Sequence, residues 1–120
     1  MSKLLVLAMG AALAACKSGA DPAVRSAISA QLQSAEAPIQ ACYQKSLTTN
    51  RKLRGMYVVQ LAVAADTGQF SEIVLRRDEP QDPVLRYCVT QTLAKLKLEK
   101  PPSKRVEVES IPIKFDWANP

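Results

Sequence analysis

Three cysteines are the residues of this 120-residue chain whose type could support distinctive chemistry, and the chain contains no histidine. Histidine is the commonest general base and the commonest metal ligand in proteins. Its absence argues against zinc enzymes and against hydrolases with a Ser-His-Asp or Cys-His arrangement. The chemistry left to the cysteines is acylation, disulfide formation or thiol redox chemistry. Their odd number means that they cannot all pair within one chain.

Cys16 follows a typical export signal. Lys3 supplies a positive charge, and residues 4–15 then run without a charge, which is too short a stretch to cross a membrane as a helix. The run ends in Leu-Ala-Ala before Cys16 and resembles the lipobox of bacterial lipoproteins. In that family the chain is cut before the cysteine, which receives acyl chains such as palmitate. We therefore predict a signal peptide over residues 1–15, cleavage between Ala15 and Cys16, and a lipidated cysteine with a short tether over residues 16–20. Ordinary secretory cleavage near a cysteine is the alternative.

Cys42 and Cys88 remain once Cys16 is assigned to the membrane. An exported protein meets an oxidising environment, so a disulfide between them is the expected state. A redox-active pair is the alternative, but such pairs usually appear as Cys-x-x-Cys, which this chain lacks. We predict a structural disulfide.

Two helical regions must position these cysteines. Asp21-Pro22 and Asp82-Pro83 each have the form of an N-cap followed by proline at the first helical position. Apolar residues recur at helical spacing from Val24 to Leu47, with Cys42 among them, and Pro38 predicts a kink or two abutting helices. The second helix is predicted from Pro83 to about Leu98, and its apolar side consists of Val84, Leu85, Cys88, Val89, Leu93 and Leu96.

Three other segments alternate between apolar and polar residues with the period of a strand. They cover residues 55–64, 70–77 and 105–115, and turn residues lie between the first two at 66–69. Changes of parity predict a bulge in the second strand and another near Ser110 in the third. Pro112 marks the third as an edge strand.

The order of elements predicts an α+β fold with the sequence α-β-β-α-β. A hairpin followed by a right-handed crossover places the third strand beside the first. The result is a three-stranded antiparallel sheet of order 2-1-3 with both helices packed on one face. Cys42 and Cys88 would then face one another.

Several residues along this frame resemble the AgmX/PglI C-terminal domain, which belongs to a group similar to the TonB C-terminal domain. They are Ile39-x-x-Cys42-Tyr43, Leu47, Leu53, Gly55, Asp66-x-Gly68, Cys88-Val89, Leu93 and Ile113-x-Phe115. The resemblance covers roughly residues 35–117, and we assign residues 21–120 to a single domain of this kind. It implies an envelope protein without enzymatic activity, sometimes linked with gliding motility or with energy transduction to the outer membrane.

The resemblance also implies how a partner is bound. In TonB-like domains a partner peptide adds a strand to a sheet edge. The candidate edges are residues 70–77 and the third strand, whose candidate partner-binding residues are Val106, Val108, Ile111, Ile113 and Phe115. We expect a non-enzymatic binding or adaptor module, in a transport or motility assembly that spans the envelope. The alternative is that the edge carries charges and proline only to prevent aggregation.

The charge of the chain, +5 from 16 Lys and Arg against 11 Asp and Glu, suggests a second function. Basic patches could bind anionic lipid or an envelope polymer, although solvated cations are the simpler explanation. The candidate anion-binding residues are Arg51, Lys52, Arg54, Arg76 and Arg77. Export and an aromatic content of 5% argue against nucleic acid as a partner.

Acidic residues near the turns, such as Asp66 and Asp78, usually bond to backbone groups. We therefore predict no catalytic residue, metal or cofactor. Lys17 after the lipidated cysteine differs from the Asp that favours inner-membrane retention in well-studied lipoproteins, so a periplasm-facing position on the outer membrane is favoured over the inner membrane.

Overall fold

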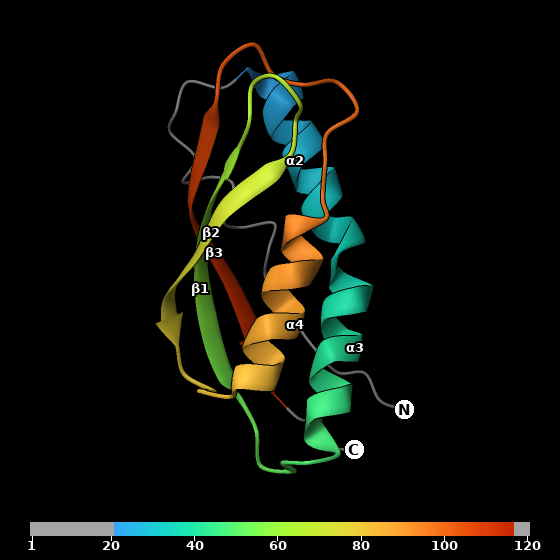
Figure 1. Cartoon of the computed structure of the whole chain (residues 1–120), viewed down its shortest axis with the longest axis vertical. Coiled ribbons are helices and arrows are strands. Elements are labelled where there is room, and N and C mark those ends of the chain that lie inside the picture. The colour runs from blue at the N-terminus through green and yellow to red at the C-terminus, as the bar shows by residue number, and fades with distance from the viewer. Residues whose placement is uncertain (1–20, 117–120) are drawn as a thin grey trace.

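The structure is a computed structural model that describes residues 21–116 (Figure 1). Within this part of the chain the elements follow the predicted order, with the first helical region divided in two. Their bounds are Pro22–Ser34 for α2, Glu36–Leu47 for α3, Gly55–Val63 for β1, Phe70–Asp78 for β2, Pro83–Ala94 for α4 and Val106–Phe115 for β3. The predicted α+β class is confirmed.

β1 is the central strand of an antiparallel sheet of order β2-β1-β3, which is the predicted order. The bulges predicted in the second and third strands both correspond to shifts in the register of pairing with β1. The register of β2 slips opposite Gln60–Ala62, and Glu72 at that place has a φ of 52°. The register of β3 slips opposite Val59–Leu61. A second slip near the end of β2 has no counterpart in the sequence prediction.

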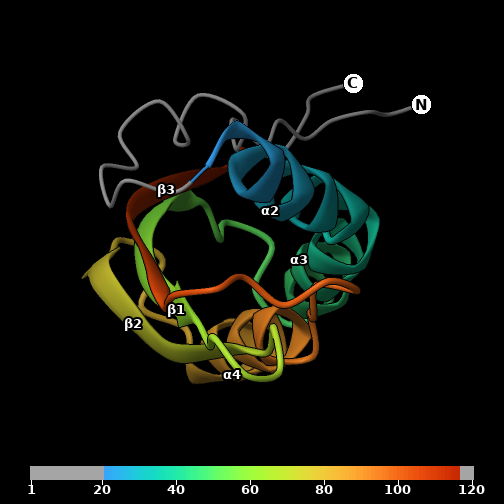
Figure 2. The ribbon, with the colours of Figure 1, turned by 90° about the horizontal axis from the view of Figure 1, so that it is seen from above.

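The helices cover one face of the sheet, as expected (Figure 2). α3 and α4 lie side by side and run in opposite directions (Figure 1). Ala35 follows α2 as its C-cap, and its N–H donates to the carbonyls of Gln31 and Leu32. Pro38 lies in the first turn of α3, where its missing N–H costs no helical hydrogen bond. The interruption at Pro38 is therefore a break between two abutting helices.

The two predicted N-caps differ in their hydrogen bonding. The Asp82 carboxylate accepts from the N–H groups of Val84 at 2.9 Å and Leu85 at 3.0 Å, as an N-cap should. Asp21 directly precedes α2, but its side chain makes no capping hydrogen bond. The predicted cap is therefore correct for α4, and for α2 only the starting position is correct.

α4 ends at Ala94, earlier than the predicted end near Leu98. The side-chain amide of Gln69 donates to the Ala94 carbonyl at 2.6 Å, which replaces a helical bond that this carbonyl loses. The chain then runs along the start of β2, where Gln69 bridges to Lys97 and the Leu98 N–H donates to the Gly68 carbonyl at 2.9 Å. Only glycine fits at position 68, because its φ is 75° and a Cβ there would lie 2.8 Å from the Leu98 carbonyl oxygen.

Cys42 and Cys88 form the predicted disulfide, which joins α3 to α4 with the two Cα atoms 5.8 Å apart. The bond closes a loop with a sequence separation of 46 residues. On the chain-entropy description, a loop of this length stabilises the folded state by about 4 kcal/mol. Small domains unfold with a total free energy of about 5–15 kcal/mol, so the bond supplies a large share.

Two buried tyrosines pack against Phe115 in the core. The ring of Tyr43 lies 4.9 Å from that of Phe115, and the ring of Tyr57 meets it edge-on at 5.4 Å. The Tyr43 hydroxyl donates to the Leu53 carbonyl at 2.6 Å, whereas the Tyr57 hydroxyl is buried without a partner in the described part of the chain. Burial raises the pKa of Tyr43 to about 12 and raises the pKa of Tyr57 as well.

Replacing both Cys42 and Cys88 by alanine should lower the free energy of unfolding by about 4 kcal/mol, because the unfolded chain regains the freedom of the closed loop. Urea unfolding followed by circular dichroism measures this change. Cys16→Ser is the matched control and should leave the free energy unchanged. A loss below about 1 kcal/mol for the double variant would show that the loop constraint contributes little.

Tyr43→Phe should lower the free energy of unfolding by about 1–2 kcal/mol, because the buried Leu53 carbonyl loses its donor. Tyr57→Phe should leave it unchanged or raise it, because an unpaired buried hydroxyl is removed. Urea unfolding measures the two changes, and equal losses in the two variants would contradict the assigned hydrogen bonding.

The free energy of unfolding of the wild-type protein should also fall as the pH rises from about 10 to about 12. Unfolded tyrosines lose their protons near pH 10, whereas Tyr43 in the folded protein keeps its proton up to about pH 12. Urea unfolding at several pH values measures this fall.

Candidate partner-binding edge of the sheet

β3 is an edge strand whose predicted partner-binding side chains point into the core. Val106, Val108, Ile111, Ile113 and Phe115 have exposed fractions between 0 and 4%. A partner cannot reach them without disrupting the packing of the sheet against the helices. What β3 can offer from outside is therefore its backbone.

The pairing of β1 shows which backbone groups β3 turns outward. The Met56 carbonyl accepts from the Glu79 N–H at 3.1 Å, and the Met56 N–H donates to the Glu79 carboxylate at 2.9 Å. Both backbone groups of Met56 thus point toward the β2 side. Backbone groups alternate in direction along a strand, so those of Tyr57 point toward β3, where Tyr57 pairs with Ile113.

Pro112 and Lys114 flank Ile113 and therefore turn their backbone groups away from β1. This is the orientation that an edge strand requires of proline, which has no N–H to donate. Lys114 presents both an N–H and a C=O at the outer edge, and Pro112 presents a C=O. Within residues 21–116, no strand pairs with this edge.

β3 provides a longer regular edge than β2 does. From Ile111 to Phe115 each residue pairs in register with β1, whereas the register of β2 slips twice. The start of β2 is also covered by the bridge between Gln69 and Lys97. Residues 111–115 are therefore the better candidate for strand addition.

Charged side chains link β3 to β2 at the other end of the edge. A guanidinium nitrogen of Arg105 lies 2.7 Å from the Glu72 carboxylate and 3.3 Å from that of Glu107. Glu107 pairs in register with Ala62 of β1, which is only 2% exposed. Exposed charges of this kind disfavour unspecific pairing of an edge strand. They leave residues 111–115 as the accessible part.

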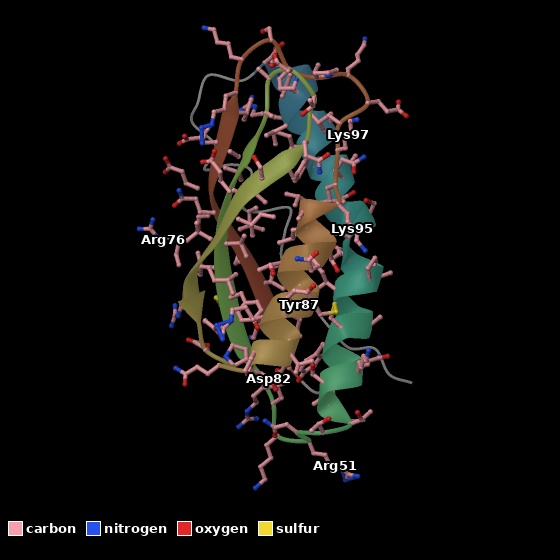
Figure 3. All side chains as sticks on the ribbon, viewed as in Figure 1. Arg51, Arg76, Asp82, Tyr87, Lys95 and Lys97 are labelled. Carbon is pink, nitrogen blue, oxygen red and sulfur yellow. A yellow bond between two sulfur atoms is a disulfide. The ribbon has the colours of Figure 1, made fainter. Side chains whose placement is uncertain are left out.

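The candidate anion-binding residues occupy separate places. Figure 3 shows Arg51 at the tip of the molecule, beyond the end of α3, and Arg76 beside the sheet. Lys52 and Arg54 belong to the same connection as Arg51, and Arg77 is held in an ion pair of 2.6 Å. Arg51 and Arg76 thus lie apart, as members of two separate basic clusters, and anion binding by either cluster stays a prediction.

The remaining predictions concern the membrane anchor and the absence of a metal site. Ala15 and Cys16 lie outside the described residues. In residues 21–116, no helix is both long enough and apolar enough to cross a membrane. The same residues contain no group of three or more His, Cys, Asp or Glu side chains that could hold a metal ion.

Lys114 is the candidate edge residue that the sequence pattern did not single out. That pattern selected the alternating apolar residues of β3, and these are the residues that the core requires. Pro112 was the available signal, because a proline inside an edge strand turns its nitrogen outward. The residue two positions later then presents its N–H on the same side.

The comparisons with known proteins identify the fold. No family model matches the sequence, and no curated protein matches it. The chain is similar to the C-terminal domain of TonB from Helicobacter pylori, solved by NMR, with a TM-score of 0.59 and 19% sequence identity. The alignment covers 99% of this chain and 100% of that one. The chain thus has a fold like that of a TonB C-terminal domain, and the more specific AgmX/PglI assignment stays a prediction.

Proposed function

We propose that this protein is a non-enzymatic interaction module of the bacterial envelope, which binds a partner protein by adding a strand of that partner to β3. The observation that carries the proposal is the outward N–H and C=O of Lys114 on a regular stretch of edge strand. Backbone hydrogen bonds supply the affinity of such a contact, and alternate side chains supply its selectivity. The similarity to a TonB C-terminal domain supports the envelope setting.

The side chains beside this edge define the partner strand further. Lys114 is exposed next to the outward backbone groups, and Pro112 contributes an acceptor but no donor. Opposite charges in cross-strand pairs are favourable. We therefore expect the partner strand to carry an acidic residue opposite Lys114 and to donate an N–H to the Pro112 carbonyl.

The proposal includes a lipid anchor and the assignment of residues 21–120 to an AgmX/PglI-type domain. Residues 1–15 would be removed as a signal peptide, and acylated Cys16 would hold the domain at the outer membrane. Residues 16–20 span less than about 20 Å when extended, so the domain would lie close to the membrane surface.

Cys16→Ser should move the protein from the membrane fraction to the soluble fraction, because the acyl chains supply the anchor. Cell fractionation and mass spectrometry of the N-terminal peptide measure this, with Ser18→Ala as the control for a substitution near the anchor that leaves all three cysteines in place. Wild-type protein that begins at another residue and carries no acyl chain would contradict the anchor.

Lys114→Pro tests strand addition directly, because it removes the outward N–H while leaving the pairing of Ile113 and Phe115 with β1 possible. Crosslinking of tagged protein in intact bacterial cells, followed by mass spectrometry, measures recovery of the partner. Recovery should fall to about a tenth or less of the wild-type amount.

Lys114→Ala is the matched control, since it removes the charge and retains the N–H. It should keep most of the recovery, and thermal unfolding should show that both variants are folded. Equal recovery with Lys114→Pro and Lys114→Ala would contradict strand addition at β3.

A further inference from the structure

A groove of about 380 Å³ lies between α3 and α4. The residues that line it belong to these two helices or immediately follow α4, and the sheet contributes none. The groove therefore opens on the outer side of the helix layer, away from the core. Its volume lies within the range of ligand-binding sites in proteins, which is roughly 300–1,000 Å³.

The groove has an exposed apolar wall and a rigid floor. Val84 and Tyr87 are 63% and 67% exposed, although the apolar periodicity of α4 predicts Val84 on the buried side. The Cys42–Cys88 disulfide lines the same groove. Large apolar side chains around a hollow are typical of an interaction surface. The covalent link between the helices reduces the ordering cost of binding.

Two lysines give the groove a positive charge. Lys45 and Lys95 line the groove, and none of its described lining residues is acidic. Neither lysine forms an ion pair with a described residue. Lys45 follows Cys42 on α3, and Lys95 follows Cys88 at the end of α4. Since the two helices run in opposite directions (Figure 1), the lysines lie on opposite sides of the disulfide.

The separation of the lysines suits a ligand with two anionic groups. Along the helix axes, at about 1.5 Å per residue, the backbones of Lys45 and Lys95 lie on the order of 15 Å apart. At this spacing each lysine can pair with a separate carboxylate. A peptide with acidic residues at both ends of an apolar centre has the required length and charge.

Ser46 provides an independent indication of a ligand. It lines the groove and is only 4% exposed, yet its hydroxyl has no hydrogen-bond partner in residues 21–116. A buried hydroxyl without a partner is unfavourable. The hydroxyl is shielded from solvent in this structure, so it can donate to a carboxylate or carbonyl oxygen in the groove once the Ser46 side chain turns toward it.

We infer that the α3–α4 groove binds an acidic segment of a partner protein. The apolar centre of the segment lies on Tyr87, Val84 and the disulfide. Its carboxylates pair with Lys45 and Lys95, and an oxygen of the segment accepts from Ser46. This site is separate from the β3 edge, so the inference does not depend on the proposed function.

The test uses the full chain with Cys16→Ser and an intact Cys42–Cys88 disulfide. The probes are two fluorescein-labelled peptides with glutamates flanking a Leu-Phe centre: an extended octapeptide and an alanine-rich helical peptide with carboxylates about 15 Å apart. Fluorescence polarisation should show that at least one probe binds about tenfold more tightly than its glutamine counterpart.

Lys45→Glu/Lys95→Glu should weaken binding of the acidic probe by about tenfold or more and create binding of the corresponding lysine peptide. Lys52→Glu/Lys97→Glu is the matched control, because it changes total charge equally at residues outside the groove. Ser46→Ala should weaken binding without lowering the stability of the free protein. Lys114→Pro should leave probe binding unchanged.

Three results would overturn the inference. The first is equal binding of the acidic probe to wild type and to the groove variant. The second is an equal loss in the control variant, which would indicate unspecific charge attraction. The third is no binding of either probe at about 1 mM. In that third case, binding to phosphatidylglycerol vesicles that depends on Lys45 and Lys95 would assign the groove to lipid, and dimers seen by light scattering would assign it to a second copy.

Discussion

The disulfide between Cys42 and Cys88 is the constraint on which the rest of this structure depends. It holds α3 against α4, and together these helices cover the core face of a sheet with only three strands. A domain of this size buries too little apolar surface to be stable by a wide margin, so a cross-link between two neighbouring helices has a strong effect. The same bond forms the floor of the groove between the helices.

The two proposed binding surfaces use different parts of this arrangement. The apolar side chains of β3 are committed to the core, which leaves its outward backbone groups near Lys114 for a partner strand. The groove lies on the outer side of the helix layer and offers side chains instead, with Tyr87 between two lysines. Strand addition is largely insensitive to salt, whereas the groove relies on charge. The two contacts can therefore be separated experimentally.

The residue patterns predicted the fold well because each pattern reflects how its own segment packs against the core or lies at the sheet edge. Alternation predicted the strands and two of the three irregularities in their pairing, and Pro112 predicted the edge position of β3. The end of α4 was predicted wrongly because the side chain of Gln69, distant in sequence, takes over the hydrogen bond of a helical carbonyl. The site was predicted only in part. Periodicity cannot show which backbone groups face outward.

Hydrogen exchange of the backbone amides of residues 111–115, measured by NMR, tests the central claim most directly. The whole chain with Cys16→Ser is used, so that every segment that could pair with β3 is present. The account predicts slow exchange for Ile111, Ile113 and Phe115, which bond to β1, and fast exchange for Lys114, whose N–H faces outward. Slow exchange at Lys114 in the isolated protein would mean that the edge is already occupied, and would contradict the claim that β3 is open to a partner.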